Sequence, residues 1–206
     1  MNIFCVVRNY APHAAEMKSA IPTEPIFFEK PHTALLTSPA ILRYPHFTFN
    51  LQHELELVIR IEQTGSSIPL SQAHHYYNSV ALGIDLTARD IQQKAKDTHM
   101  PWLLSKGFDG SAIVSPFIPL TELGKSIDNL SFELQIGDTT VQQGNSHNMI
   151  FSPNQLIAHL SQYITLTSGD LIYTGTPAGV GPIQQGDHLV GSLEGRPVLS
   201  LDITEN

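Results

Sequence analysis

The feature that most restricts the fold of this chain is residues 51–61, LQHELELVIRI, in which apolar and polar side chains alternate. Successive side chains of a β-strand point to opposite faces, so the alternation predicts a strand with one mainly apolar face. That face carries Leu51, His53, Leu55, Leu57, Ile59 and Ile61, and the opposite face carries Gln52, Glu54, Glu56, Val58 and Arg60. The segment therefore indicates a sheet that rests on a core through one side.

Further short apolar segments predict more strands, and only a few segments carry helical signals. The predicted strands are 3–7, 26–28, 34–36, 80–86, 111–117, 131–137, 139–144, 170–175, 187–195 and 196–204, with a hairpin across Gly137-Asp138. The predicted helices are about 12–20, 71–79, 88–97 and 153–164, the last opened by a capping box of Ser152 and Gln155 around Pro153. Helices neither alternate regularly with strands nor separate from them. The pattern predicts an α+β, mainly β fold, a mixed β-sandwich or roll with a few short helices rather than a doubly wound sheet.

Composition bounds the class of protein. A length of 206 residues, with 41% hydrophobic and 15% charged residues, suits one globular domain spanning 1–206. The net charge of -8 argues against a nucleic-acid or anionic-membrane surface, which needs clustered positive charge. Cys5 is the only cysteine, which excludes an intramolecular disulfide, and no stretch of about 20 apolar residues predicts a membrane span. The start lacks a secretory signal, so the expected location is the cytoplasm.

Glu54 and Glu56 are the sharpest chemical feature. Side chains two apart on a strand point the same way, about 6.6–6.8 Å apart at Cα, so the two carboxylates can converge on a hard cation. The plain alternative is a solvated strand face. Asp85 ends the apolar strand VALGID, where it could supply a third carboxylate or cap the following turn.

One pair of residues could activate water or move a proton. His13 and Glu16 are three apart on the predicted helix at 12–20, so the carboxylate could orient the imidazole as a general base. A surface ion pair is the alternative. His53 adjoins the glutamates but faces the other way, and HELE is not the H-E-x-x-H pattern of zinc proteases.

Three further side chains could meet an anion. Lys106, between WLLS and GFDG, is either a partly desolvated anion contact or a loop lysine with its amine in water, and Lys30 has the same two explanations. Segment 174–182, TGTPAGVGP, could offer backbone N–H groups and the Thr176 hydroxyl. It lacks the G-K-[ST] ending of a P-loop, so nucleotide binding has no support.

Six blocks, taken together and in order, resemble the fumarylacetoacetate hydrolase family and cover the chain from Ile3 to about Ile203. They are CVVRNYAPHAAEM (5–17), FFEKPHTAL (27–35), HELELVI (53–59), GIDLTARDIQ (83–92), PWLLSKGFDGSAIVSP (101–116) and the long segment 146–182. The sequence departs from the family's usual residues at Val7, His32 and Arg60. None of these departures removes a candidate metal ligand.

The resemblance implies a single catalytic domain over 1–206, with the family's mixed β-sandwich roll, and a set of roles. Glu54, Glu56 and Asp85 would bind Mg²⁺ or Mn²⁺, with Ca²⁺ a further possibility. The catalytic groups would be His13, Glu16 and Lys106, and the substrate contacts would be Arg8, Lys30, Lys106 and Thr176. Small members of the family are usually homodimers, so a second copy of the chain is the expected protein partner.

The resemblance also implies a reaction: hydrolytic cleavage of the C–C bond of 2,4-dioxo acids (acylpyruvates) to pyruvate and a carboxylate, through a metal-stabilised enolate. Oxaloacetate decarboxylation, oxaloacetate keto–enol tautomerisation, and hydration or isomerisation of a 2-oxo-alkenoate use the same chemistry and stay open as alternatives. The expected ligand is a small 2-oxo acid, with no nucleic acid and no membrane. A cation-stabilised binding module without turnover is the alternative from another class, but it leaves His13, Glu16 and Lys106 unexplained.

Overall fold

A computed structural model describes residues 1–16 and 20–205. The strands of this part form three sheets, and the largest contains parallel as well as antiparallel pairs. Its order is β2-β1-β13-β6-β7-β9-β3, with β10 paired to β7. These strands are β1 (Ile3–Val7), β2 (Ile26–Lys30), β3 (Leu35–Thr37), β6 (Leu55–Arg60), β7 (Ser79–Asp85), β9 (Ala112–Val114), β10 (Ile118–Pro119) and β13 (Leu171–Tyr173).

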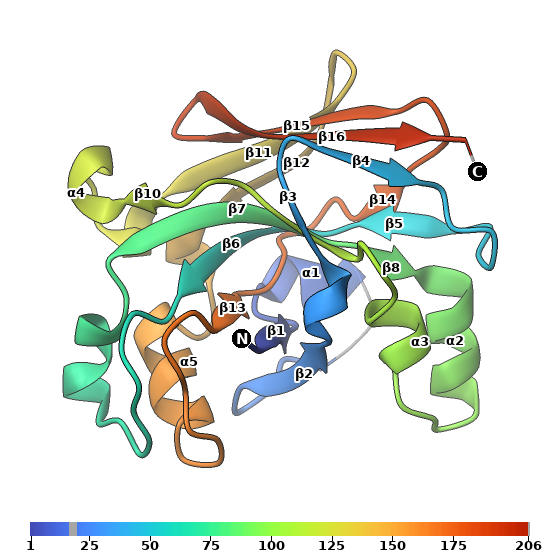
Figure 1. The fold of residues 1–206 in the computed structure, drawn as a ribbon. Helices are drawn as coiled ribbons and strands as arrows, with labels where there is room; N and C mark the ends of the chain where they lie inside the picture. The colour runs from blue at the N-terminus through green and yellow to red at the C-terminus, as the bar shows by residue number, and fades with distance from the viewer. Residues whose placement is uncertain (17–19, 206) are drawn as a thin grey trace.

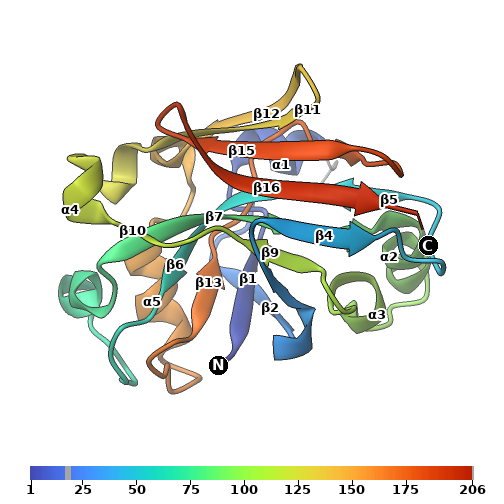
Figure 2. The ribbon, with the colours of Figure 1, turned by 45° about the horizontal axis from the view of Figure 1, so that its top comes forward.

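The second sheet covers the first, and a third, small sheet adjoins them. Figures 1 and 2 both show β15 and β16 lying across one face of β7. The second sheet has the order β12-β11-β15-β16-β4, with β12 (Thr139–Asn145), β11 (Ser131–Ile136), β15 (His188–Leu193), β16 (Arg196–Thr204) and β4 (Ala40–Arg43). The third has the order β14-β5-β8, with β14 (Gly181–Pro182), β5 (Leu51–His53) and β8 (Thr87–Ala88). The predicted mixed β-sandwich is confirmed.

The helices are short and lie around the sheets (Figure 1). The α-helices are α1 (Ala11–Glu16), α2 (Arg89–Asp97), α3 (Leu103–Lys106), α4 (Leu120–Leu123) and α5 (Pro153–Leu160). The 3₁₀ helices are η1 (His32–Ala34), η2 (Leu70–Tyr76), η3 (Ile127–Asn129) and η4 (Ser146–Asn148). Of these, α2 and α3 pack together beside β8, where they border the site described below.

The predicted helices differ from the observed ones mainly at their ends. The capping box of Ser152 and Gln155 is present, but α5 ends at Leu160 rather than near 164. The hydroxyl of Ser161 accepts a hydrogen bond from the backbone N–H of Ile68, which holds the chain to another segment at the point where the helix ends. The segment predicted as a helix at 71–79 is the 3₁₀ helix η2. The last part of the helix predicted at 12–20 includes residues 17–19, outside the described residues.

The strand predicted at 51–61 is observed as two strands, and both of its faces are buried. Glu54 interrupts it, so β5 and β6 belong to different sheets. Leu57 and Ile59 face the core between the two larger sheets, whereas Val58 packs on the other side with Ala81 and Tyr173. The simple alternation therefore predicted the strand correctly but could not show that a second apolar cluster covers the face bearing the glutamates.

Candidate active site

The strand register brings three acidic side chains together. In the antiparallel pair of β6 and β7, Leu55 lies opposite Ile84, and the backbone N–H of Asp85 donates to the carbonyl oxygen of Glu54 at 2.9 Å. Glu54, Glu56 and Asp85 are all buried, and each offers a carboxylate oxygen within 4.8 Å of the others. The two-residue spacing of the glutamates and the strand-end aspartate thus converge on one point.

Two of these three side chains stand where the chain leaves the large sheet. Glu54 separates β5 from β6, and Asp85 is the last residue of β7, followed after one residue by β8. Both β5 and β8 belong to the small third sheet. The acidic triad therefore lies at the junction of two sheets, on backbone that neighbouring strands hold on both sides.

Two buried lysines face the carboxylates. Lys106 Nζ lies 2.8 Å from Glu54 Oε2 and 2.7 Å from Asp85 Oδ2. Lys30 Nζ lies 2.7 Å from Asp85 Oδ1. It also donates to the backbone carbonyls of Leu86, Lys106 and Ser111. Lys30 is 0% exposed and is not among the residues that line the cavity, so the structure places it behind Asp85.

Burial and neighbouring charges shift the pKa values of Glu54 and Glu56 in opposite directions. Burial opposes ionisation of Glu54, but Lys106 and Arg89 outweigh it and hold the pKa of Glu54 well below its ordinary value. Burial, together with the nearby Asp85 and Glu54 carboxylates, raises the pKa of Glu56 well above its ordinary value, even though the N–H of Gly175 donates to it at 2.7 Å. Glu56 is thus the carboxylate whose charge the protein alone compensates least.

The donor set fits a hard divalent cation. Mg²⁺, Mn²⁺ and Ca²⁺ prefer oxygen ligands, and three carboxylate oxygens that lie within 4.8 Å of one another could reach one such ion. Asp85 Oδ1 is buried and accepts no hydrogen bond from the described residues, since its contact with Lys30 lies outside hydrogen-bond geometry. Glu56, whose pKa burial and the neighbouring carboxylates raise, is the carboxylate that a bound cation would stabilise most.

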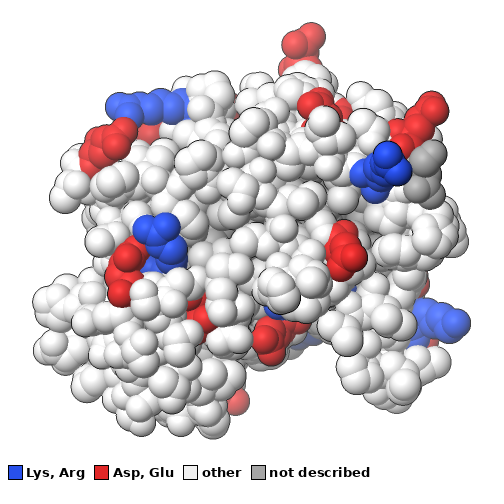
Figure 3. Space-filling view, in the orientation of Figure 1, with Lys and Arg blue, Asp and Glu red and all other residues white. Residues whose placement is uncertain are grey.

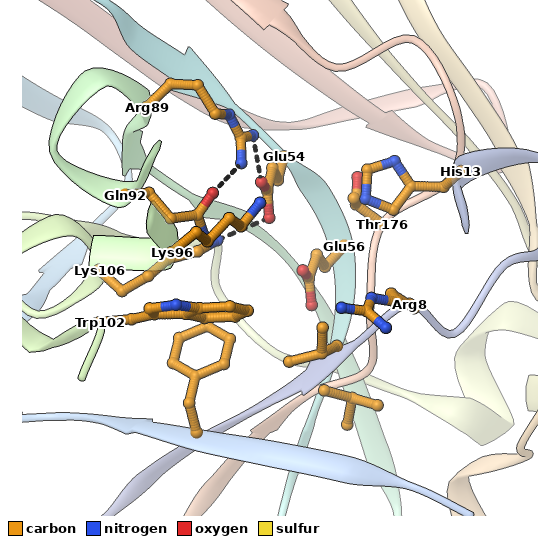
Figure 4. A pocket seen from close by; sticks show the side chains of 13 residues that line it. Arg8, His13, Glu54, Glu56, Arg89, Gln92, Lys96, Trp102, Lys106 and Thr176 are labelled. Carbon is orange, nitrogen blue, oxygen red and sulfur yellow. Dashed lines mark hydrogen bonds and ion pairs between the residues drawn. The ribbon is translucent and has the colours of Figure 1, made fainter. Parts of the chain in front are cut away.

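Opposite the triad, the predicted dyad is present. His13 Nδ1 lies 3.1 Å from Glu16 Oε2, and the backbone N–H of Gly179 donates to the other oxygen of Glu16 at 3.2 Å. A carboxylate acceptor favours the tautomer with hydrogen on Nδ1, which leaves Nε2 free to take a proton. His13 is 6% exposed and lines the same cavity as Glu54 and Glu56 (Figure 4).

Thr176 and Arg8, which the resemblance implied as substrate contacts, also line this cavity. The Thr176 hydroxyl donates to the carbonyl of Leu55 at 2.8 Å and accepts from the Gln142 amide at 2.9 Å. Its proton is therefore already used, so a ligand here would meet the oxygen and the neighbouring backbone. Arg8 follows β1 with a backbone φ of 59°, in the left-handed region.

Seven residues of the cavity wall were not predicted from the sequence, among them Arg89, Gln92, Lys96 and Trp102. Arg89 donates to Glu54 at 2.6 Å, to Gln92 at 2.6 Å and to Gln52 at 2.8 Å, as Figure 4 shows for the first two. The one available signal was the spacing of Arg89 and Gln92, which lie three apart on a predicted helix directly after Asp85. No pattern in the sequence indicated that this helix packs beside the cavity.

The described residues show no continuous patch of positive charge on the face of the molecule seen in Figure 3. On the face seen in Figure 3, lysine and arginine side chains stand singly among wide uncharged areas. Within residues 1–16 and 20–205, no helix is long and apolar enough to span a bilayer.

Comparison with known proteins decides the family. A model described as fumarylacetoacetate (FAA) hydrolase C-terminal matches residues 2–203. The chain belongs to the fumarylacetoacetate hydrolase family. The resemblance inferred from the six sequence blocks is thereby confirmed, together with the family's fold and its enzymatic character.

The relatives and solved structures of this family that resemble the chain span more than one reaction. The mitochondrial oxaloacetate tautomerase of Bos taurus is 40% identical, covering 97% of this chain and 89% of the relative. The oxaloacetate tautomerase of Escherichia coli (strain K12) is 39% identical, covering 94% and 88%. The fumarylpyruvate hydrolase from Pseudomonas aeruginosa, solved with Mn²⁺ and pyruvate, superposes with a TM-score of 0.94 at 35% identity, covering 100% of this chain and 90% of that one.

Proposed function

We propose that this member of the fumarylacetoacetate hydrolase family interconverts the keto and enol forms of oxaloacetate. The observation that carries the proposal is the His13–Glu16 dyad, whose histidine lines one cavity together with Glu54 and Glu56. The family resemblance implied acylpyruvate hydrolysis first, with oxaloacetate chemistry as the alternative. The tautomerases that are 39–40% identical over nearly the whole chain support the reverse order.

The acidic triad is the proposed metal site. Glu54, Glu56 and Asp85 would hold Mg²⁺ or Mn²⁺, and the cation would supply Lewis-acid polarisation of the 2-oxo group. Support comes from the spacing of the triad and from the Mn²⁺ in the 35% identical hydrolase structure.

The residues of the chain then divide the proton chemistry. His13 Nε2 takes a proton from C3 of oxaloacetate, and the enolate oxygen then takes a proton from the imidazolium or from water to give the enol, while Glu16 keeps the imidazole in the tautomer and orientation this requires. The Lys106 amine, raised in pKa because Asp85 and Glu54 outweigh its burial, stays protonated and donates to the oxygen on which negative charge develops. Arg89 holds Glu54 in place rather than meeting substrate.

Acylpyruvate hydrolysis is a second candidate because one observation favours it specifically. The P. aeruginosa fumarylpyruvate hydrolase matches the whole chain at a TM-score of 0.94. In that reaction His13 would take a proton from water as the water attacks the 4-oxo carbon, and the same base would serve.

One assay separates the two reactions. Purified protein with Mg²⁺ is mixed with enol-oxaloacetate, and in a parallel reaction with acetylpyruvate or fumarylpyruvate. Loss of enol absorbance is followed along with pyruvate release, and a chelator serves as control. Chelator-sensitive ketonisation of oxaloacetate without pyruvate supports the tautomerase. Pyruvate from an acylpyruvate supports the hydrolase, pyruvate from oxaloacetate indicates a decarboxylase, and silence on every substrate contradicts the proposal.

We also propose that the protein is a homodimer, as the family resemblance implied. Phe49 and Ile41 are 87% and 68% exposed, and large exposed apolar side chains of this kind suit an interface between copies. Light scattering during gel filtration tests this, and a monomeric mass would refute it. The cytoplasmic location stays a prediction, which fractionation of cells expressing the protein would check.

A further inference from the structure

More positively charged side chains surround the acidic triad than are required to neutralise its three carboxylates. The chain as a whole carries a net charge of -8. Yet five cationic side chains line the cavity or contact its carboxylates, against three carboxylates in the triad. The five are Arg8, Lys30, Arg89, Lys96 and Lys106. A divalent cation would add two more charges and the Glu16 carboxylate would remove one, so the site would carry an excess of about three positive charges, a field that favours a multiply charged anion.

Three of the five cations are already occupied. Lys30 pairs with Asp85, and Lys106 bridges Asp85 and Glu54. Arg89 is held by Glu54 and by two glutamine side chains. We therefore do not assign any of these three side chains to the end of the substrate that lies away from the 2-oxo group.

Lys96 and Arg8 are the two that remain. Neither takes part in an ion pair or in a side-chain hydrogen bond within residues 1–16 and 20–205. Lys96 comes from α2 and Arg8 from the end of β1, on opposite sides of the cavity, and no dashed line reaches either in Figure 4. The Lys96 amine rests over the Trp102 ring, 5.6 Å from its centroid, which limits where the amine can go.

A solvated surface lysine would not show these properties. Burial lowers the pKa of Lys96, and the neighbouring guanidinium groups of Arg89 and Arg8 lower it further. The protein thus keeps like charges close to one another at the cavity, an arrangement that an anion would relieve.

The position of Arg8 is also specified by the fold. A backbone φ of 59° is unfavourable for arginine, so surrounding contacts must hold it. The next residue supplies them: the Asn9 side chain donates to the carbonyls of Phe151 and Thr174 and accepts from the N–H of Phe151. The turn that aims Arg8 at the cavity is thereby fixed.

We propose that Lys96 and Arg8 bind the second carboxylate of a dicarboxylic 2-oxo acid, and so make the enzyme prefer oxaloacetate to monocarboxylic acids of the same length. The inference rests on the proposed function for the identity of the substrate. The subsite itself selects any dianion whose second carboxylate reaches the two side chains.

Matched ligands isolate the second carboxylate. L-Malate and 2-hydroxybutyrate have the same four-carbon chain and differ in a terminal carboxylate against a methyl group, and neither can tautomerise. Their affinities for the Mg²⁺-loaded protein are measured by calorimetry, and kcat/KM for oxaloacetate is measured alongside. The variants are Lys96→Met, Arg8→Gln and, as control, Lys94→Met, which removes an exposed lysine from the same helix.

We expect Lys96→Met to weaken malate binding and to lower kcat/KM roughly tenfold to a hundredfold, the range of a lost charge-assisted hydrogen bond, and to leave 2-hydroxybutyrate unchanged. Arg8→Gln should act in the same direction, and Lys94→Met should change nothing. Equal weakening of malate and 2-hydroxybutyrate by Lys96→Met, or no weakening of either, would overturn the subsite. Circular dichroism and the unfolding midpoint show whether each variant is folded.

The two proposals fail separately. If the wild-type protein leaves oxaloacetate unchanged but binds malate far more tightly than 2-hydroxybutyrate, and Lys96→Met abolishes that difference, the tautomerase is wrong and the subsite stands. If oxaloacetate turns over at a rate that Lys96→Met and Arg8→Gln do not alter, the tautomerase stands and the subsite is wrong.

Discussion

Replacing Lys30 by methionine should lower the free energy of unfolding of this protein without changing its affinity for substrate. Lys30 is 0% exposed, its Nζ lies 2.7 Å from Asp85 Oδ1, and it donates to three backbone carbonyls. Methionine preserves most of the volume but leaves the buried carboxylate with one cation fewer. Removing one partner of a buried ion pair destabilises a protein by about 3–5 kcal/mol.

The structure narrows that range. Lys106 keeps its 2.7 Å contact with Asp85 Oδ2, and Ser111 Oγ still donates to the carbonyl of Lys106 at 2.7 Å. The free energy of unfolding should therefore fall by an amount near the lower limit of this range, about 3 kcal/mol. For a chain of this size that corresponds to a fall of about 6–12 °C in the unfolding midpoint.

Urea unfolding of the metal-free wild-type and variant proteins measures the difference. Lys125→Met is the matched control because Lys125 pairs with Glu194 at the surface, where an ion pair contributes about 0–1 kcal/mol. If Lys30→Met lay within 1 kcal/mol of the wild type while KM rose, the reasoning would be refuted, and Lys30 would be the substrate contact that the family resemblance implied.

The site and the core give four further predictions. His13→Ala should lower turnover about 10²–10⁴-fold, as expected for a lost general base, and a variant that kept more than about a tenth of wild-type turnover would remove that assignment. Mg²⁺ at about 100 times its Kd should stabilise the protein by about 2.7 kcal/mol, or about 5–11 °C. Because the pKa of Glu56 is raised in the metal-free protein, its ionisation destabilises the fold as pH rises above the ordinary glutamate value, so the Mg²⁺ effect in thermal scans should be largest at neutral pH and shrink toward pH 4.5; an effect that grew on acidification would contradict this. Gly83→Ala would place a Cβ 2.5 Å from Tyr173 Cε1 and 2.9 Å from the Ile113 carbonyl, so we expect a loss of about 1–3 kcal/mol by urea unfolding, and an unchanged midpoint would refute it.

Much of the candidate site was visible in the sequence because it depends on local spacing. Glu54 and Glu56 are two apart on a strand, and Asp85 closes an apolar segment, so their common direction follows from strand geometry. The His13–Glu16 pair follows from helix geometry in the same way.

What the sequence could not give depends on distant segments. Lys30 stands between a glutamate and a proline and looks like an exposed loop lysine, yet carbonyls from residues 86, 106 and 111 surround its amine. Lys96 is one of two lysines near the end of α2, and only the packing of that helix beside β8 distinguishes it from Lys94. The interruption at Glu54 is likewise set by its partners, since β5 and β6 pair with different strands.

Because the strand is interrupted at Glu54, the affinity for a metal ion would depend on the angle between two sheets. Glu54 and Asp85 lie at the two points where the chain passes between the large sheet and the three-stranded sheet. A metal ion bound by both residues would therefore link the two sheets. The distance between the two carboxylates, and with it the metal affinity, would change with the orientation of the small sheet relative to the large one. Substitutions in β14, whose Gly181 and Pro182 pair with β5, would therefore change the metal affinity without replacing a metal ligand. Members of the family could in this way adjust how much metal they require while every acidic residue stays the same.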